Sequence, residues 1–220
     1  MKKTVFLVVI VFSAIMMACQ PANEKKALAL INEYMQEYLY DYKSYEPIFV
    51  KIDTAYNRPI YDENVVALVK NIIKTQASID DLEQEIEWAE RDVRHARSSM
   101  AIWNSAYTRE HYNIAVEEYN EALSKLNNYK KEKIAADSIV IKSKDVLKEL
   151  IAQIDEGVCG WSITHNYKCK SRGGTELSSQ SIFIMDEDFT QILCSINEEN
   201  MLEFVEIAEK LAEILGEVGD

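Results

Sequence analysis

Apolar residues recur through the middle of the chain at gaps that alternate strictly between three and four residues. The first stripe has one polar member, Thr75, and consists of Val65, Leu68, Ile72, Thr75, Ile79, Leu82, Ile86, Ala89, Val93 and Ala96. A second stripe, interrupted by Lys133 and Ser143, consists of Tyr112, Ala115, Tyr119, Ala122, Leu126, Tyr129, Lys133, Ala136, Val140, Ser143, Leu147, Leu150 and Ile154. Such gaps mark the a and d positions of a coiled coil, so the pattern predicts two long helices with one apolar seam each.

The stretch between the two stripes predicts a reversal of the chain. Asn104 and Ser105 lie there among aromatic residues, and we place the reversal at residues 104 to 110. Two helices of this length form an antiparallel hairpin about 60 Å long, in which position 82 is expected to face residues 126 to 129. The alternative is a single unbroken helix that pairs with a second copy of the chain.

The flanks of this region predict a small α+β base. A stripe from Leu28 to Tyr45 indicates an amphipathic helix that ends before Pro47, and residues 48–54 alternate as a short strand. Gly157 and Gly160 end the long helical region. Residues 161–169 then alternate as a strand, and after a turn at SRGG a second strand is expected at SIFIMD. A third strand can form at FTQILCSI, and a final helix is expected at NEENMLEFVEIAEKLAEILGEV.

The predicted fold is therefore mainly α, with a long antiparallel coiled-coil hairpin on a small α+β base. Residues 26–60 and 156–218 are expected to form the discontinuous base, which combines a short antiparallel sheet with the N- and C-terminal helices. Residues 61–155 form the inserted hairpin. Because the segment 48–54 is too short to be stable alone, we expect it to pair with one of the strands in 161–185.

The N-terminus has the layout of an export signal that ends at a cysteine. Two lysines precede an apolar run that stops at Ala18 and Cys19, and this run is shorter than the roughly 20 residues of a membrane span. The ending M-M-A-C resembles the lipobox of bacterial lipoproteins, which implies that residues 1–18 are a signal peptide, that Cys19 is lipidated and that 19–25 is a tether. Gln20 is not the aspartate that retains some lipoproteins at the inner membrane, which favours the outer membrane and leaves its face open.

The charge excludes one class of partner. Removing Lys2 and Lys3 with the signal lowers the basic count from 24 to 22 against 37 acids, so the net charge becomes −15. A surface this acidic repels phosphate backbones and anionic headgroups, so we expect no nucleic-acid partner and membrane attachment through the lipid alone.

A resemblance extends over about 60 residues. KSYEPIFVKID and, much later, GWSITHNYKCKSRGGTELSSQSIFIMDEDF resemble a small α+β module of uncharacterised Bacteroides-like lipoproteins. Asn166, Lys168 and Cys169 depart from that pattern. The resemblance implies a fold and a cellular address but no activity.

Candidate chemistry is sparse. His95 and His111 could lie close on opposite arms of the hairpin with Glu110 as a third metal ligand, but a zinc site needs a fuller ligand set, and we expect no metal and no cofactor. His165 falls on an apolar strand face, where a structural histidine is the default. The sequence contains no Gly-rich phosphate loop, G-x-S-x-G or H-E-x-x-H motif. The pairing of the remaining cysteines, Cys159, Cys169 and Cys194, is left open because three is an odd number.

The sequence thus predicts a membrane-anchored binding or spacer protein and not an enzyme. Trp103, Tyr107 and His111 are the expected partner-binding tip, and the partner is expected to be a protein. A periplasmic adaptor or chaperone-like hairpin of an envelope transport system is the alternative, and a hydrolase of unknown type is the third possibility.

Overall fold

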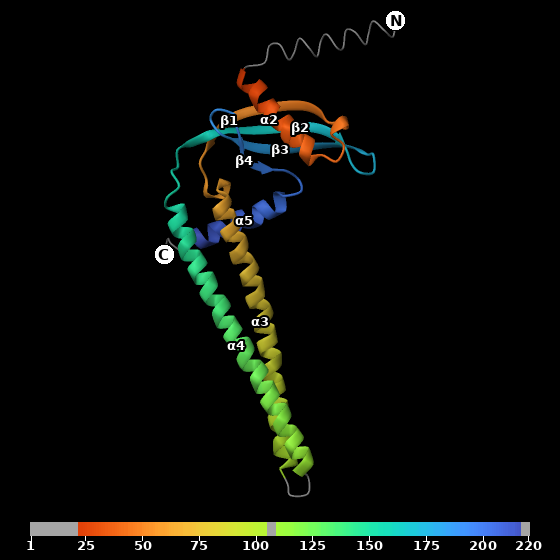
Figure 1. Cartoon of the computed structure of the whole chain (residues 1–220), viewed down its shortest axis with the longest axis vertical. Helices are drawn as coiled ribbons and strands as arrows, with labels where there is room; N and C mark the ends of the chain where they lie inside the picture. The colour runs from red at the N-terminus through yellow and green to blue at the C-terminus, as the bar shows by residue number, and fades with distance from the viewer. Residues whose placement is uncertain (1–21, 105–108, 217–220) are drawn as a thin grey trace. The chain divides into compact units, whose positions relative to one another are not determined.

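The computed structural model describes residues 22–104 and 109–216 (Figure 1). In these ranges the chain is mainly helical and also contains one four-stranded sheet. The α-helices are α2 (Ala22–Tyr38), α3 (Glu63–Trp103), α4 (Arg109–Ile151) and α5 (Met201–Gly216). The strands are β1 (Glu46–Tyr56), β2 (Val158–Lys170), β3 (Glu176–Met185) and β4 (Ile192–Ile196), and short 3-10 helices cover Tyr42–Ser44 and Pro59–Tyr61. The expected combination of long helices with a short antiparallel sheet is confirmed at this level.

The chain divides into two compact units, which are described separately below. The sheet unit contains the described residues up to Glu63 together with Ile154–Ala208. The paired-helix unit contains Asn64–Gln153 and the described residues from Glu209 onward, so the division passes through α5.

In the sheet unit, all neighbouring strands are antiparallel and follow one another in the order β1-β2-β3-β4. Ile52 pairs with Ile163, which in turn pairs with Phe183, so apolar side chains from three strands share one face. The expectation that residues 48–54 pair with a strand of the later segment is confirmed by the pairing of β1 with β2. The possible third strand in FTQILCSI is β4.

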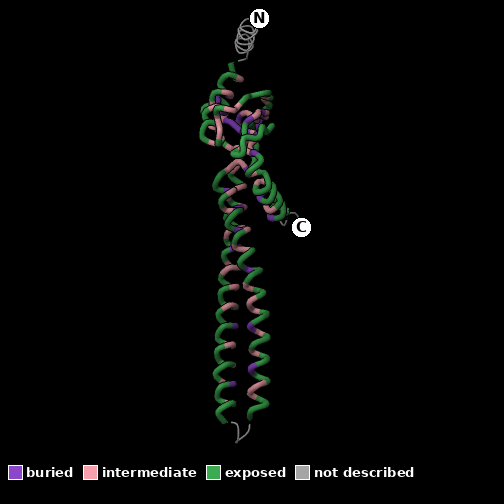
Figure 2. The backbone as a smooth tube through the Cα atoms, turned by 90° about the vertical axis from the view of Figure 1, so that its right-hand side faces the viewer, coloured by how far each residue is buried: buried purple, intermediate pink, exposed green. Residues whose placement is uncertain are grey.

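Helix α2 covers the apolar face of this sheet. Its buried residues Ala27, Ile31 and Met35 are four positions apart, so they form one stripe that packs on Ile163 and Phe183. Burial of a large apolar side chain contributes about 1.5–3 kcal/mol, so this layer is the main source of stability in the sheet unit. Figure 2 shows buried positions, in purple, inside the sheet unit.

The amphipathic stripe in the sequence continues beyond the end of the observed helix. Helix α2 ends at Tyr38, not just before Pro47, and the chain reaches β1 through an irregular turn. The Ser44 hydroxyl donates a hydrogen bond to the Asp41 carbonyl at 2.8 Å and accepts one from the backbone N–H of Lys170 at 2.8 Å. This tertiary bond to β2 competes with further helix, which explains the earlier end.

The acidic turn between β3 and β4 is organised by one carboxylate. The Asp186 carboxylate accepts hydrogen bonds from the backbone N–H groups of Thr190 and Gln191 and from the Thr190 hydroxyl. The Trp161 indole N–H donates to the Glu187 carbonyl at 3.0 Å, and the Trp161 ring stacks on Phe189. The acidic residues of this segment therefore build a turn.

In the paired-helix unit, α3 and α4 lie side by side and antiparallel (Figures 1 and 2). Lys133 lies 3.2 Å from Glu83, whereas Lys130 lies 2.8 Å from Glu90, so residue numbers fall on one helix as they rise on the other. Every position of the two apolar stripes is buried or half-buried. The alternative prediction of a single unbroken helix is wrong, since α3 ends at Trp103 and α4 begins at Arg109. Residues 105–108 of the expected reversal lie outside the described residues.

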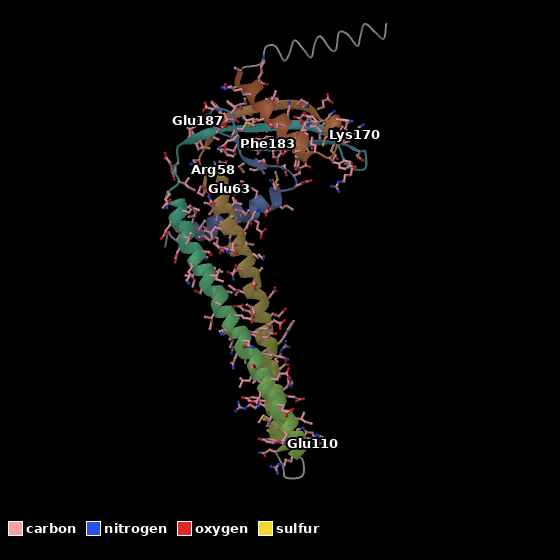
Figure 3. The ribbon with its side chains drawn as sticks, in the orientation of Figure 1. Arg58, Glu63, Glu110, Lys170, Phe183 and Glu187 are labelled. Carbon is pink, nitrogen blue, oxygen red and sulfur yellow. The ribbon has the colours of Figure 1, made fainter. Side chains whose placement is uncertain are left out.

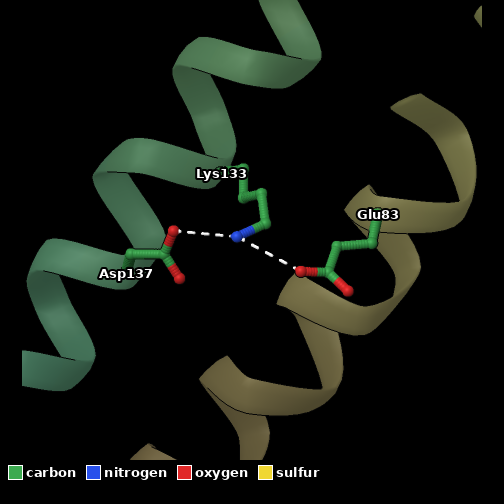
Figure 4. A network of polar contacts seen from close by, with 3 residues as sticks. All are labelled: Glu83, Lys133 and Asp137. Carbon is green, nitrogen blue, oxygen red and sulfur yellow. Dashed lines mark hydrogen bonds and ion pairs between the residues drawn. The ribbon is translucent and has the colours of Figure 1, made fainter. Parts of the chain in front are cut away.

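The ion pairs also correct the expected register. Because Lys133 reaches Glu83, position 82 is level with the turn around residue 136 and not with residues 126 to 129 (Figure 4). Side chains on a helix lean toward its N-terminus. In an antiparallel pair, two residues whose side chains meet therefore have higher numbers than two residues at the same height along the helix axes. A count outward from the bend compares residues at the same height and so gives numbers that are too low.

Candidate functional site

The expected tip is represented in the structure by two stacked rings. The rings of Trp103 and His111 lie 4.9 Å apart between centroids with an interplanar angle of 29°, and they come from the end of α3 and the first turn of α4. The Trp103 side chain is 38% exposed. Tyr107, the third expected tip residue, and Cys19, the expected lipidation site, lie outside the described residues.

The two histidines of the helices are not brought together. His95 lines a cavity of about 280 Å³ with Ala96 of α3 and Ala122 of α4. Ala122 lies eleven residues beyond His111, so helical rise separates the two histidines by roughly 16 Å along the axis. In the described parts of the chain, no three His, Cys, Asp or Glu side chains are grouped closely enough to hold a metal ion.

The sheet unit contains a larger groove that the sequence analysis did not identify. It has a volume of about 450 Å³ and lies where the β2–β3 turn meets the end of α2 and the start of the β4–α5 connection. Figure 3 labels Lys170 of this groove at one end of the sheet and Glu187 at the other. Volumes of this size are common among small-molecule sites. We call it the tyrosine groove after three of its lining residues, Tyr38, Tyr40 and Tyr167.

A cation–π pair of side chains lines the tyrosine groove. The Arg172 guanidinium lies over the Tyr40 ring, 5.4 Å from its centroid, and both residues line the groove. Tyr40 is 73% exposed despite this cover, so one ring face is held by the cation and the rest of the ring is open to solvent. Such a cation–π contact contributes about 0.5–1 kcal/mol at an exposed site, enough to bias the ring toward one position.

The inner part of the groove is formed by tyrosines that are held in place. Burial raises the pKa of the Tyr38 hydroxyl, and the nearby Glu199 carboxylate, which is its hydrogen-bond partner, raises it further. Burial also raises the pKa of Tyr167, while the neighbouring Ser181 and Ser179 hydroxyls oppose that change. Both hydroxyls therefore stay protonated at neutral pH and can donate hydrogen bonds.

His165 is a structural residue of the sheet core, as its position on the apolar strand face suggested. It is fully buried, and its Nε2 lies 2.8 Å from the Tyr45 hydroxyl. Burial lowers the pKa of His165 to about 4, and a backbone contact with Phe49 partly opposes this change. The imidazole is therefore neutral at pH 7. Its Nδ1 makes no hydrogen bond of good geometry to the described residues.

The three described cysteines are free thiols. Burial raises the pKa of each of Cys159, Cys169 and Cys194, so the reactive thiolate is disfavoured at neutral pH. Cys169 lies on the floor of the tyrosine groove, where it packs as a small apolar side chain.

Comparison with family models, with curated proteins and with solved structures found no match for this chain. Among the described helices, none has the length and apolarity needed to cross a membrane.

Proposed function

We propose that this protein is a lipid-anchored envelope protein in which α3 and α4 form a coiled-coil hairpin that acts as a spacer and presents a partner-binding tip. The observation that carries the proposal is the antiparallel pairing of two helices of 41 and 43 residues through the Glu83–Lys133 and Glu90–Lys130 ion pairs. At about 1.5 Å per residue, each helix spans roughly 60 Å.

The register supports a continuous seam between the two helices. With Glu83 and Glu90 opposite their lysines, Thr75, the only polar residue of the first stripe, is level with Ser143 of the second. The same register pairs large with small residues, as for Leu82 with Ala136 and Ala89 with Tyr129. Matching of polar with polar and of large with small positions is the complementarity that an intramolecular coiled coil requires.

Lys133 is the second interruption of the apolar stripe, and its contacts explain how the seam tolerates it. Its amine lies 3.2 Å from Glu83 across the helix pair and 3.0 Å from Asp137 one turn along α4 (Figure 4). The carboxylate hydrogen bonds of Asp137 and Glu83 raise the pKa of Lys133, which stays charged. The long methylene stem can cover the seam while the charge remains at the surface.

The anchor is proposed from the leader sequence. Residues 1–18 are the signal peptide and Cys19 carries the lipid in this account, which favours attachment to the outer membrane. Two or more acyl chains hold a protein on a bilayer far more firmly than a single chain. The acidic mature surface gives no electrostatic attraction to anionic lipids, so the acyl chains on Cys19 alone attach the protein to the membrane.

The tip is proposed as the partner surface because its aromatic rings are both ordered and accessible. The Trp103–His111 stack fixes the indole, and tryptophan side chains are enriched among residues that dominate protein interfaces. Trp103 is flanked by Ile102, whose side chain is also largely exposed, so apolar area is available beside the indole.

Site-specific photo-crosslinking in intact cells tests the spacer and tip roles together. A photoreactive amino acid replaces Ile102 in one variant and Ser124, an exposed residue in the middle of α4, in the other. We expect a discrete protein adduct from position 102 and none from position 124. Loss of the adduct when Trp103→Ala is added supports recognition through the indole.

Equal labelling from both positions, or no adduct from position 102, contradicts the proposal. If the adduct contains a component of an envelope transport system, the adaptor role becomes the correct description of the hairpin.

A further inference from the structure

Tyr40 of the tyrosine groove differs from the core tyrosines near it in the sequence. Tyr34 packs edge-on against Phe183 with ring centroids 5.2 Å apart, and Tyr42 stacks on Tyr45 at 5.4 Å, so these rings are committed to the fold. Tyr40 lies outside that core and is mostly exposed. Of these neighbouring tyrosines, Tyr40 is therefore the one whose ring is available to a ligand.

Charged groups of both signs line the tyrosine groove. Glu37, Glu198 and Glu199 contribute carboxylates, and Lys170 and Arg172 contribute cations. A ligand with a net charge of either sign would meet like charges on one side of the groove, at a cost in repulsion and desolvation. A neutral ligand with many hydroxyls avoids this cost, because each hydroxyl can donate to a carboxylate or accept from a cation in a charge-assisted hydrogen bond.

The apolar surfaces of the groove suit a ring with a C–H face. Tyr40 presents a flat exposed face, and Leu177, which also lines the groove, is partly exposed. Arg172 holds the Tyr40 ring from one side, so less conformational entropy is lost when a second ring packs against it. Tyr38 and Tyr167 also line the groove and add aromatic surface to it.

From these observations we propose that the tyrosine groove binds a neutral saccharide, with one sugar ring packed on Tyr40 and its hydroxyls bonded to the surrounding carboxylates and cations. This inference is independent of the proposed spacer function, because all of its residues belong to the sheet unit. It requires no metal ion and no covalent step.

Binding of the mature chain to an array of neutral, acidic and amino oligosaccharides tests this inference. The lipidated protein is kept in a detergent without a sugar headgroup, and the best ligands are then titrated calorimetrically. We expect neutral oligosaccharides to bind and their acidic and cationic counterparts to bind more weakly. Tyr40→Ala should weaken binding by about tenfold, whereas Tyr40→Phe should retain most of the affinity because the ring remains.

Tyr56→Ala is the matched control. Tyr56 is another exposed tyrosine of the sheet unit, at the end of β1 and outside the groove, and its loss should leave the affinity unchanged. Circular dichroism and melting of each variant check that the sheet unit remains folded. The inference is overturned if no oligosaccharide binds, if acidic or amino sugars bind more tightly than neutral ones, or if Tyr56→Ala and Tyr40→Ala weaken binding equally.

Discussion

The amine of Lys133 on α4 lies 3.2 Å from the carboxylate of Glu83 on α3. These residues are fifty positions apart in the sequence, and their contact sets the register of the paired helices. Because Lys133 is a member of the apolar stripe, the contact also shows how a charged residue is accommodated where an apolar one is expected.

The register leads to a crosslinking prediction. A variant with Leu82→Cys and Ala136→Cys should be crosslinked within one chain by a short bis-maleimide, because the two positions are level. The matched pair Leu82→Cys with Leu126→Cys places the second thiol about 15 Å further along the axis and should react poorly. Gel mobility and mass spectrometry at high dilution distinguish intramolecular from intermolecular products. Preferential crosslinking of the 82–126 pair would contradict the register.

The burial of His165 predicts a specific dependence of stability on pH. Its pKa is about 4 in the folded chain and about 6.5 in the unfolded chain. Between these values the unfolded chain binds a proton that the folded chain does not, so this residue's contribution to stability is complete above pH 6.5 and falls as the pH drops toward 4. The full loss is about 3 kcal/mol in the free energy of unfolding.

Urea denaturation at several pH values measures this contribution. His165→Gln should remove it, so the difference between the parent and the variant should shrink steadily from pH 7 to pH 4. His95→Gln, which changes an exposed histidine of α3, is the matched control. A constant difference between the parent and His165→Gln across this range would show that His165 does not titrate as described.

Gly160 is predicted to be irreplaceable in β2. Its φ angle is +139°, and a Cβ atom at this position would lie 2.0 Å from the carbonyl oxygen of Met185. Gly160→Ala should therefore lower the free energy of unfolding by about 3 kcal/mol or more, since both the backbone angle and the strand pairing must change.

Gly173→Ala provides the matched control for this strand variant. A Cβ atom on Gly173 would meet only the Ser171 hydroxyl oxygen at 3.7 Å, so we expect a change within about 0.5 kcal/mol. Thermal melting of both variants makes the comparison. Equal effects of the two substitutions would mean that the close approach of β2 and β3 at Gly160 is not rigid.

The sequence predicted those elements whose periodicity is long or strictly alternating. Ten positions at alternating gaps, nine of them apolar, were enough to locate α3 and the face that it buries, and two-residue alternation located β1 and β2. The predicted helix boundary failed where a tertiary contact competed with a further helical turn. Helix α2 ends early because Ser44 bonds to β2.

The site residues were harder to predict for a different reason. Trp103 and His111 are close in sequence, so a reversal between them brings their rings together whatever the remainder of the fold. The tyrosine groove combines the end of α2, the β2–β3 turn and the residues before α5. More than 100 residues of sequence separate the end of α2 from the other two segments. Tyr40 lies in the sequence between core tyrosines such as Tyr34 and Tyr42, and periodicity alone could not distinguish it from them.

Mass spectrometry of the N-terminal peptide of the mature protein, purified from the cells that make it, tests the proposed lipid anchor most directly. The account predicts that this peptide begins at Cys19 and carries a diacylglyceryl group on the cysteine sulfur. A Cys19→Ala variant should lose this modification and leave the membrane fraction. A mature N-terminus that begins after Cys19, or one that begins at Cys19 without lipid, would contradict the account of a lipid-anchored protein.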